Sequence, residues 1–283
     1  MHVDDSSRSR FALVGPGRAG TALSLALVGR GWTATAVAGR APDAPSTRWI
    51  AAALRAPAVP VEDAGRDADV VVVATPDAAI SGVATALVPS LRRDALVVHL
   101  SGARSLHEFD DLVLTRPDVA VGSLHPLQAL PSGEVGQARL PGSWCAIDGP
   151  PERMERLALT LGMRPFCVDA AHRVDYHAAA CVASNHLVAL LGQVERLADG
   201  AGVPLAAFLP LVRATLDNVD ELGTAAALTG PVARGDTATV AAHIDALPTH
   251  ERDAYRALAA AALRLTDHDD EELRAVVGGA LAS

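Results

Sequence analysis

The feature that most constrains this chain is a glycine-rich turn near its start, Gly15-Pro16-Gly17-Arg18-Ala19-Gly20. The apolar run 11–14 before it is typical of a buried strand, and the Ala- and Leu-rich stretch 21–30 after it is typical of a helix. In this setting the first glycine of G-x-G-x-x-G allows a sharp turn, the second lets the backbone approach a pyrophosphate, and the third lets helix and strand pack closely. We therefore predict that this turn binds a dinucleotide at the helix N-terminus. A turn that uses glycine for geometry alone is the alternative.

The rest of the first half alternates apolar runs with helical stretches, which predicts a parallel, doubly wound α/β sheet. The expected strands are 33–38, 69–75, 95–100, 119–123, 144–147 and 164–168, with a helix at 151–161. Past Asp169, a candidate N-cap, the strand signals stop and a helical pattern runs to about Asp199. Further helices fit 205–222, 237–246, 250–265 and 269–281. The sequence thus predicts an α/β domain over residues 1–168 and an all-α domain over 169–283.

Composition narrows the class of protein. Half of the 283 residues are hydrophobic, and no apolar run approaches the roughly 20 residues that cross a bilayer. The first ten residues are polar and lack the apolar core of a signal peptide, so we expect a cytoplasmic protein without a membrane partner. A net charge of −9 argues against a nucleic-acid partner. The three widely spaced cysteines, without a Cys-x-x-Cys pair, predict neither a metal site nor a disulfide framework.

The strand 33–38 ends in Gly39-Arg40, where NAD-binding sheets carry a carboxylate for the ribose. Because a guanidinium matches the geometry of a 2′-phosphate, Arg40 favours NADP over NAD. Asp43 is near, but in a Pro-rich loop, and an ordinary surface arginine is the alternative for Arg40.

Two other strands end in residues that could line the cofactor site. Thr75 and Pro76 follow the strand 69–75, although Pro76 also suits the first position of a helix with Thr75 or Asp77 as its cap. Ser101 and Gly102 follow the strand 95–100 and could pack near a nicotinamide ring, or form a polar strand-to-loop transition.

A histidine follows the strand 119–123, again at the carboxyl edge of the predicted sheet. His125 could donate a proton to a carbonyl oxygen, or accept one from a hydroxyl, near neutral pH. A histidine with a structural role alone is the alternative. Pro126 would stiffen the loop that carries it.

The long helix after Asp169 carries the densest polar set of the chain. At about 100° per residue, Arg173, His177 and Ser184 fall within roughly 40° of one another. Small residues lie between them, which suits close approach by a ligand or by another helix. The set comprises His172, Arg173, Asp175, Tyr176, His177, Ser184, Asn185 and His186.

The loop 228–237 enters a later helix, with Asp236 or Thr237 as its expected cap. Arg234 in this loop could neutralise a substrate carboxylate, or the loop could be a turn shaped by glycine and proline alone.

Together these motifs resemble the Rossmann-like oxidoreductases that carry a DUF2520 domain, relatives of ketopantoate reductase, pyrroline-5-carboxylate reductase and prephenate dehydrogenase. The resemblance implies a helical C-terminal domain that makes a homodimer contact, with a small-molecule substrate between the domains. Classical ketopantoate reductases use a lysine on the first helix of the second domain, but all 24 basic residues here are arginine. The resemblance rests on Gly15–Gly20, Ala74–Asp77, His99–Gly102, Ser123–Gln128, Tyr176–Ala180, Ala183–Asn185 and Thr229–Asp236.

The combined prediction is an NADP-dependent oxidoreductase that acts on a small carboxylate-bearing substrate, such as a ketopantoate-type 2-keto acid. His125 or His177 would transfer the proton, Ser184 and Asn185 would orient the substrate oxygen, and the substrate-binding residues would be Arg173, Tyr176 and Arg234. An NADP(H)-binding sensor without turnover is one alternative, and a prephenate- or arogenate-type dehydrogenase is another.

Overall fold

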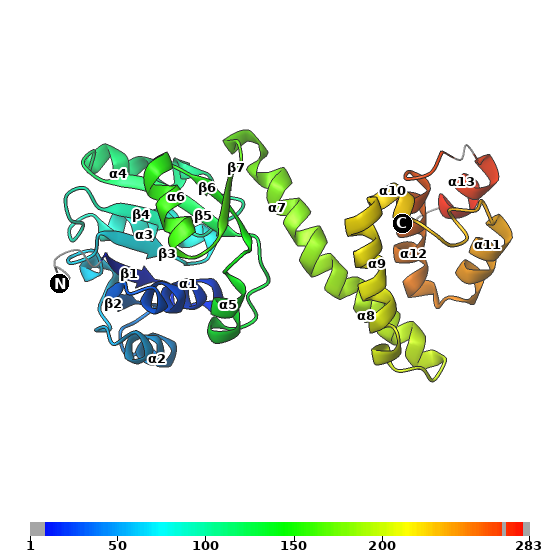
Figure 1. Cartoon of the computed structure of the whole chain (residues 1–283), viewed down its shortest axis with the longest axis horizontal. Helices are drawn as coiled ribbons and strands as arrows, with labels where there is room; N and C mark the ends of the chain where they lie inside the picture. Colours follow the sequence, from blue (N-terminus) through cyan, green and yellow to red (C-terminus); the bar gives the residue numbers. More distant parts are fainter. Residues whose placement is uncertain (1–8, 268–269, 280–283) are drawn as a thin grey trace. The chain divides into compact units, whose positions relative to one another are not determined.

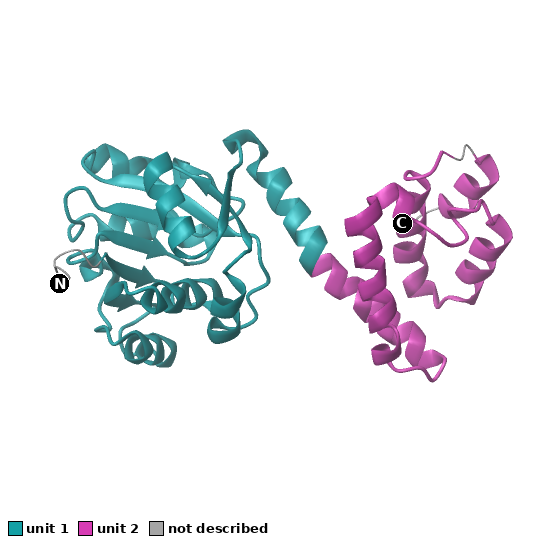
Figure 2. Ribbon diagram, viewed as in Figure 1, with its two compact units in different colours: residues 1–184 teal, residues 185–283 magenta. Residues whose placement is uncertain are grey.

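The computed structural model describes residues 9–267 and 270–279 and divides into two compact units, residues 1–184 and residues 185–283 (Figure 2). The predicted domain boundary at 168/169 marks the end of the sheet, whereas the division by contacts falls sixteen residues later, within the long helix. The last part of the predicted helix 269–281 lies partly outside the described residues, and the described α13 spans Glu271–Val277.

Unit 1 is built on a seven-stranded sheet with the order β2-β1-β3-β4-β5-β6-β7 (Figure 1). The strands predicted from apolar runs lie within about two residues of the observed ones, apart from the longer β5. Burial explains this agreement, since β3 and β4 are buried along their whole length. The strands are β1 Arg10–Val14, β2 Thr33–Ala38, β3 Val70–Val73, β4 Leu96–His99, β5 Ala120–Pro126, β6 Trp144–Asp148 and β7 Arg164–Cys167.

The prediction of a wholly parallel sheet is wrong at one pair, because β6 runs antiparallel to β5. After β5 the chain forms the short helix α5 (Gly133–Arg139), which packs against α1 (Arg18–Gly29) and does not cross back over the sheet. The side chain of Gln137 donates a hydrogen bond to the carbonyl oxygen of Leu25, 3.2 Å away. The next strand therefore starts at the edge where β5 ended and must run in the opposite direction.

Helices cover both faces of this sheet. One apolar core joins the sheet to α1, α2 (Pro45–Leu54) and α6 (Pro151–Thr160). The other core joins it to α3 (Ile80–Leu87), to α4 (Asp110–Thr115) and to the turn before α4. This three-layer arrangement confirms the predicted doubly wound α/β fold and leaves the carboxyl edge of the parallel strands free for loops.

A helical stretch follows the sheet, as predicted. Asp169 accepts a hydrogen bond from the backbone N–H of Ala171 and so acts as the expected cap. The stretch consists of α7 (Arg173–Cys181), a π-helical turn (Val182–His186) and α8 (Leu187–Gly200). The π-helical turn was not predicted, and it changes the rotation per residue from the α-helical value beyond Cys181.

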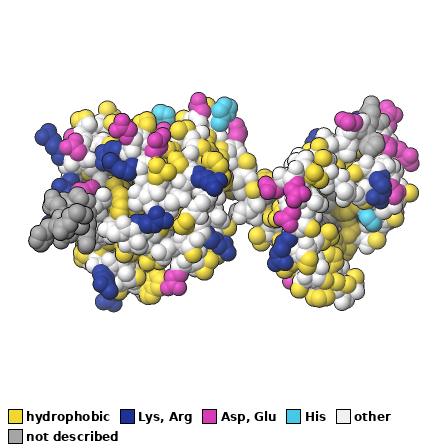
Figure 3. Space-filling model, viewed as in Figure 1, with side chains coloured by type: hydrophobic (Ala, Val, Ile, Leu, Met, Phe, Trp, Pro, Cys, Tyr) yellow, Lys and Arg dark blue, Asp and Glu magenta, His cyan; other side chains and the backbone are white. Residues whose placement is uncertain are grey.

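Unit 2 continues with α9 (Leu209–Leu222), α10 (Thr224–Ala227), α11 (Thr237–Ala246), α12 (Thr249–Leu263) and α13. The predicted cap Asp236 is confirmed, since its carboxylate accepts a hydrogen bond from the N–H of Thr239. The buried core joins α11, α12 and α13, whereas α9 buries none of its residues. Figure 3 shows hydrophobic side chains (yellow) on the surface of this unit.

No single helix among the described residues is both long and apolar enough to span a membrane. By length and composition alone, one bent pair, 170–200 with 205–222, passes the same test.

Candidate active site

The glycine turn between β1 and α1 has the geometry that the motif predicts. Gly15 has φ +95°, and a Cβ there would lie 2.6 Å from the backbone of Ala74. A Cβ on Gly20 would lie 2.6 Å from the carbonyl oxygen of Gly15. At Gly17, in contrast, the nearest such atom is the carbonyl oxygen of Ala74, 4.0 Å away. The turn is thus closed at its first and third glycines and open at the second, where a pyrophosphate would approach.

Helix α1 begins at Arg18, three residues before the predicted start, so Arg18 and Ala19 belong to its first turn. The N–H groups of a first helical turn lack partners within the helix and favour an anion. The side chain of Arg18 is exposed. A dinucleotide therefore fits the residues present here: Gly17 leaves room for its phosphates, and the N–H groups of α1 would hold them.

The segment after β3 lies against this turn. A Cβ on Gly15 would come within 2.7 Å of the backbone nitrogen of Thr75. The hydroxyl oxygen of Thr75 is enclosed and has no hydrogen-bond partner among the described residues. The alternative of Thr75 or Asp77 as a helix cap is wrong, because Pro76 precedes the 3-10 turn Asp77–Ala79 and no side chain caps it. Exposed Pro76 and half-buried Thr75 thus stay candidates for the cofactor site.

The end of β2 meets the start of α2. A Cβ on Gly39 would overlap the hydroxyl of Thr47, which is fully buried and unpartnered within the described part of the chain. Arg40, the next residue, is exposed. A guanidinium and the N-terminus of a ten-residue helix thus lie on the same connection, an arrangement suited to a phosphate group. The sequence analysis did not single out Thr47. Its place two residues after Pro45, a residue favoured at the start of a helix, was the signal that could have indicated it.

Strands β4 and β5 bring the next group of predicted residues together. His125 lies within β5 and not in a following loop, and Pro126 is the last residue of that strand. A Cβ on the buried Gly102 would lie 2.8 Å from Cε1 of His125 and 2.7 Å from Nδ1 of His177. The imidazole rings of His125 and His177 are 5.6 Å apart between centroids. Only a residue without a side chain at position 102 allows both rings to approach this loop.

Tyr176 completes this cluster. Its hydroxyl oxygen lies 2.7 Å from Nδ1 of His125, and the two rings meet edge to face. The ring of Tyr176 also contacts Phe166 of β7, with ring centroids 5.8 Å apart. We call His125, His177, Tyr176 and Gly102 the edge cluster.

Arg173 is the first residue of α7, and its side chain is only 1% exposed. Its Nη2 donates a hydrogen bond to the carbonyl oxygen of Ser101 at 3.1 Å. Nη1 lies 4.0 Å from the carboxylate of Asp148, and neither Nε nor Nη1 has a hydrogen-bond partner in the described residues. Burying a cation with so weak an ion pair lowers the stability of the fold, so the burial of Arg173 calls for an explanation beyond packing.

Burial and this cation set the protonation states of His125 and Tyr176. Burial lowers the pKa of His125 to about 4, with further contributions from His177 and Arg173. Burial raises the pKa of Tyr176 to about 12, and the charge of Arg173 acts in the opposite direction. Both side chains are therefore neutral near pH 7.

His99 is a further buried histidine that the sequence indicated only as part of the His99–Gly102 segment. It is fully buried, and its Nδ1 accepts a hydrogen bond from the N–H of Ser101 at 3.2 Å. Burial lowers its pKa to about 4, with Arg173 as the second cause. Its position as the last residue of β4 was the signal that could have separated it from Ser101 and Gly102.

The remaining predicted residues are not part of this cluster. Ser184 is exposed on the π-helical turn, at the end of unit 1, whereas Arg173 is buried. Asn185 and Arg234 belong to unit 2 and are both exposed. Their assignments stay predictions. Within the described ranges, no three His, Cys, Asp or Glu side chains are placed to hold a metal ion.

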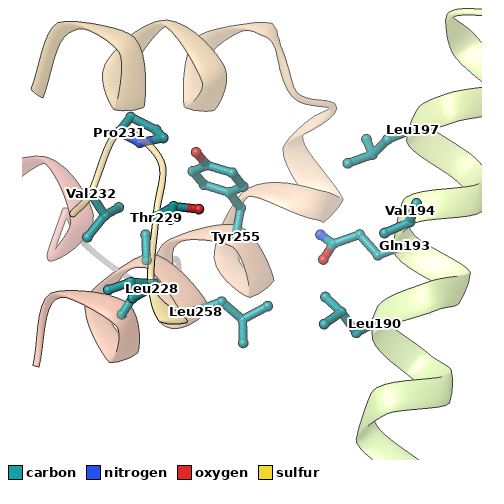
Figure 4. Close-up of a pocket in the computed structure, with 12 residues that line it drawn as sticks. Leu190, Gln193, Val194, Leu197, Leu228, Thr229, Pro231, Val232, Tyr255 and Leu258 are labelled. Carbon is teal, nitrogen blue, oxygen red and sulfur yellow. The ribbon is translucent and has the colours of Figure 1, made fainter. Parts of the chain in front are cut away.

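Unit 2 contains an apolar pocket of about 350 Å³. Leu190, Val194 and Leu197 of α8 line one side, opposite the loop that carries Thr229 and Pro231 (Figure 4). Tyr255 of α12 also lines it, and its hydroxyl lies 2.8 Å from Nδ1 of the exposed His243.

Two family models match the chain. Residues 4–125 match the Rossmann-like domain, and residues 143–262 match DUF2520, described as a domain of unknown function. The chain is a Rossmann-like protein with a DUF2520 domain. The resemblance carried by the motifs is thereby confirmed.

Several solved structures share the fold. A candidate NADP oxidoreductase from Bacteroides fragilis has a TM-score of 0.78 at 23% identity, covering 91% of this chain and 98% of that chain. A 1-pyrroline-5-carboxylate reductase from Streptococcus pyogenes has a TM-score of 0.61 at 14% identity, covering 90% and 98%. A reductive aminase from Aspergillus terreus, in complex with NADPH and ethyl levulinate, has a TM-score of 0.58 at 15% identity, covering 96% and 92%. No curated protein matches the chain.

Proposed function

We propose that this DUF2520 protein is an NADP-dependent oxidoreductase that transfers a hydride to or from a CH–OH or C=N carbon of a small carboxylate-bearing substrate. The observation that carries the proposal is that the open glycine turn and the edge cluster both belong to unit 1. Val14 and Val73 are register partners in β1 and β3, and Val73 and His99 in β3 and β4. In a parallel sheet the carboxyl ends of such strands meet at one edge, where a dinucleotide and its reacting group bind.

Each end of the cofactor would have its own residues. The pyrophosphate would bind Gly15, Gly17 and the first turn of α1, and the 2′-phosphate would bind Arg40 beside the N-terminus of α2. The nicotinamide would pack against Ser101 and Gly102. When bound, the reduced cofactor supplies the hydride, and the protein must then supply a proton and hold the substrate.

The names of the similar structures support this class of chemistry without fixing the substrate. One is described as a candidate NADP oxidoreductase, one reduces pyrroline-5-carboxylate by its name, and one is in complex with NADPH. A ketopantoate-type 2-keto acid and a cyclic imine are therefore the first substrates to test.

The cofactor preference is tested by exchanging the charge at the end of β2. Arg40→Asp should weaken NADPH binding by at least tenfold, because a carboxylate repels the 2′-phosphate, and should change NADH binding far less. Titration calorimetry with both cofactors measures this, and Arg55→Asp, at the other end of α2, is the charge-matched control. Equal affinities of the parent protein for NADPH and NADH would overturn the preference for NADP.

The proposed enzyme would be a homodimer formed through its C-terminal helices. Among the described residues of unit 2, α9 leaves Leu211 65% and Leu216 53% exposed. Solvent-exposed apolar faces of this kind are typical of surfaces that another chain covers. Sedimentation at micromolar concentration should show a dimer in the parent and a monomer in Leu216→Asp. A parent protein that sediments as a monomer would refute this assembly.

A further inference from the structure

The two histidines of the edge cluster differ in what their nitrogens can reach. Nδ1 of His177 is enclosed behind Gly102 without a partner among the described residues, and its Nε2 lies 3.7 Å from the thiol of Cys181. Nδ1 of His125 is hydrogen-bonded to the hydroxyl of Tyr176. Its Nε2, unlike Nδ1 of His177, is not shut off from its surroundings without a partner. His125 is therefore the histidine with a nitrogen left for a ligand.

The hydrogen bond to Tyr176 indicates where the proton of His125 resides. Both groups are neutral near pH 7, so one proton lies between the phenol oxygen and Nδ1. The phenol has no other hydrogen-bond partner among the residues that the structure describes, so its proton is satisfied only if it points at Nδ1. The proton of the ring itself is then on Nε2, and His125 is a neutral donor at that atom.

Arg173 supplies the electrostatic part of this arrangement. Its positive charge lowers the pKa of Tyr176, whereas burial and the neighbouring Cys145 raise it. His125 also faces His177 and Arg173, which lower its pKa, and Asp77, which raises it. A buried guanidinium with two unbonded nitrogens therefore favours a phenolate at Tyr176 and disfavours an imidazolium at His125.

We propose that Tyr176 and His125 form a proton relay in which His125 donates at Nε2 and Tyr176 replaces that proton at Nδ1, with Arg173 as a positioning residue that stabilises the phenolate. This relay rests on the proposed function, and it adds Tyr176 to the residues that move the proton. It also assigns Arg173 a role other than contact with a substrate carboxylate.

Every proton and electron pair can be followed when this relay serves the reduction of a carbonyl group. As the carbonyl carbon accepts the hydride, the electron pair of the C=O π bond moves to oxygen, and this oxygen takes the proton from Nε2 of His125. Nδ1 takes the proton of Tyr176, which becomes a phenolate. After the product leaves, Nε2 takes a proton from water, which departs as hydroxide, while Nδ1 returns its proton to the phenolate and so restores the starting tautomer. The ring of His125 stays neutral throughout, which agrees with its low pKa.

The position of the proton is tested in the cofactor-free protein. Nitrogen NMR of histidine-labelled full-length protein should show His125 protonated at Nε2 and unprotonated at Nδ1, with a mixed tautomer in Tyr176→Phe. The control is Tyr255→Phe, which removes the other tyrosine hydroxyl and should leave the His125 signals unchanged. A parent protein with His125 protonated at Nδ1 would overturn the relay, whether or not any substrate is turned over.

The role of Arg173 is tested by titrating the absorbance of tyrosinate. The chain has two tyrosines, so Tyr255→Phe leaves only Tyr176 to observe. Arg173→Met in that background should shift the titration of Tyr176 to higher pH, and Arg173→Lys should restore part of the parent value. An unchanged titration in Arg173→Met, with a folded protein by circular dichroism, would remove Arg173 from the relay.

The role of the relay in catalysis is tested by steady-state kinetics with NADPH and a panel of 2-keto acids. Tyr176→Phe keeps the ring between Phe166 and His125 and should lower kcat by roughly 10²- to 10⁴-fold with little change in KM. Turnover equal to that of the parent would refute the relay. Absence of NADPH binding in the parent would instead refute the proposed function, so the two failures are distinguishable.

Discussion

Within the residues that the structure describes, two tyrosines each contact a histidine, one pair in each unit, and the two pairs have nearly the same internal geometry. The Tyr176–His125 pair in unit 1 has an O···Nδ1 distance of 2.7 Å and rings at 87°. The Tyr255–His243 pair in unit 2 has 2.8 Å and 88°. The hydrogen bond alone therefore cannot distinguish a reactive pair from a structural one.

The surroundings of the two pairs differ in the burial of the histidine and in the presence of a nearby cation. His125 is half-buried on β5 at the carboxyl edge of the sheet. It lies near the buried Arg173 and next to Gly102, whose lack of a side chain leaves space for the imidazole ring. His243 is exposed on α11, and Tyr255 borders an apolar pocket. The comparison teaches that burial, a nearby cation and access for the ligand turn this pair of side chains into a candidate site.

The largest expected difference between the pairs is in turnover. His125→Ala should lower kcat/KM by roughly 10²- to 10⁴-fold, because it removes the group that exchanges the proton with the substrate. His243→Ala, the matched change in unit 2, should leave kcat/KM within about twofold, since surface substitutions change little. Steady-state kinetics with NADPH and the keto-acid panel measure both, and comparable losses in the two variants would break the comparison.

A smaller effect is expected from filling the space beside the unit 1 pair. Gly102→Ala would place a Cβ 2.7 Å from Nδ1 of His177 and 2.8 Å from Cε1 of His125, so both rings must move. We expect a loss in kcat on the order of 10²-fold from the displaced ring and a destabilisation of about 1–3 kcal/mol.

Gly82→Ala is the control for this substitution. Gly82 lies in α3, and a Cβ there would meet no neighbouring atom within 4 Å, so alanine should be neutral or slightly stabilising. Urea unfolding and kinetics of both variants provide the measurement. A fully active Gly102→Ala protein would show that the rings need no such space.

The smallest expected effect is on the pH dependence of stability. The pKa of His125 and of His99 falls from an ordinary value near 6.5 in the unfolded chain to about 4 in the folded protein, chiefly because of burial. The unfolded state therefore binds more protons between these values, and stability present above pH 6.5 is lost as the pH falls toward 4. This loss should be confined to unit 1.

Tryptophan fluorescence reports this unit selectively, because Trp32, Trp49 and Trp144 all lie within residues 1–184. Urea unfolding followed by fluorescence should give a free energy of unfolding that decreases from about pH 7 to about pH 5, with a shallower decrease in His125→Gln. A decrease in this variant as steep as in the parent, or steeper, would mean that His125 is not the group that titrates.

Much of unit 1 follows from the sequence, because its signals are local. The strands are apolar runs that must be buried, and Gly15 and Gly20 occupy positions where a side chain would collide with backbone. The antiparallel β6 could not be predicted, since its direction depends on where α5 packs. The π-helical turn at Val182–His186 likewise carries no sequence signal that we could use.

The candidate site was predictable residue by residue but not as an arrangement. His125 and Tyr176 were each singled out, yet they are 51 positions apart, and only the fold brings them within hydrogen-bond distance. The burial of Arg173 was not expected because arginine side chains are mostly exposed. Helical periodicity placed Ser184 with Arg173, and the π-helical turn that carries Ser184 makes that spacing unreliable.

The most direct test of the account is a crystal structure of the parent protein with NADP and a 2-keto acid bound. The account predicts the pyrophosphate at Gly17 and the first turn of α1, the nicotinamide against Ser101 and Gly102, and the keto oxygen within about 3 Å of Nε2 of His125. A nicotinamide bound away from this edge, or a keto oxygen held by other groups while Nε2 of His125 remains unbonded, would contradict it.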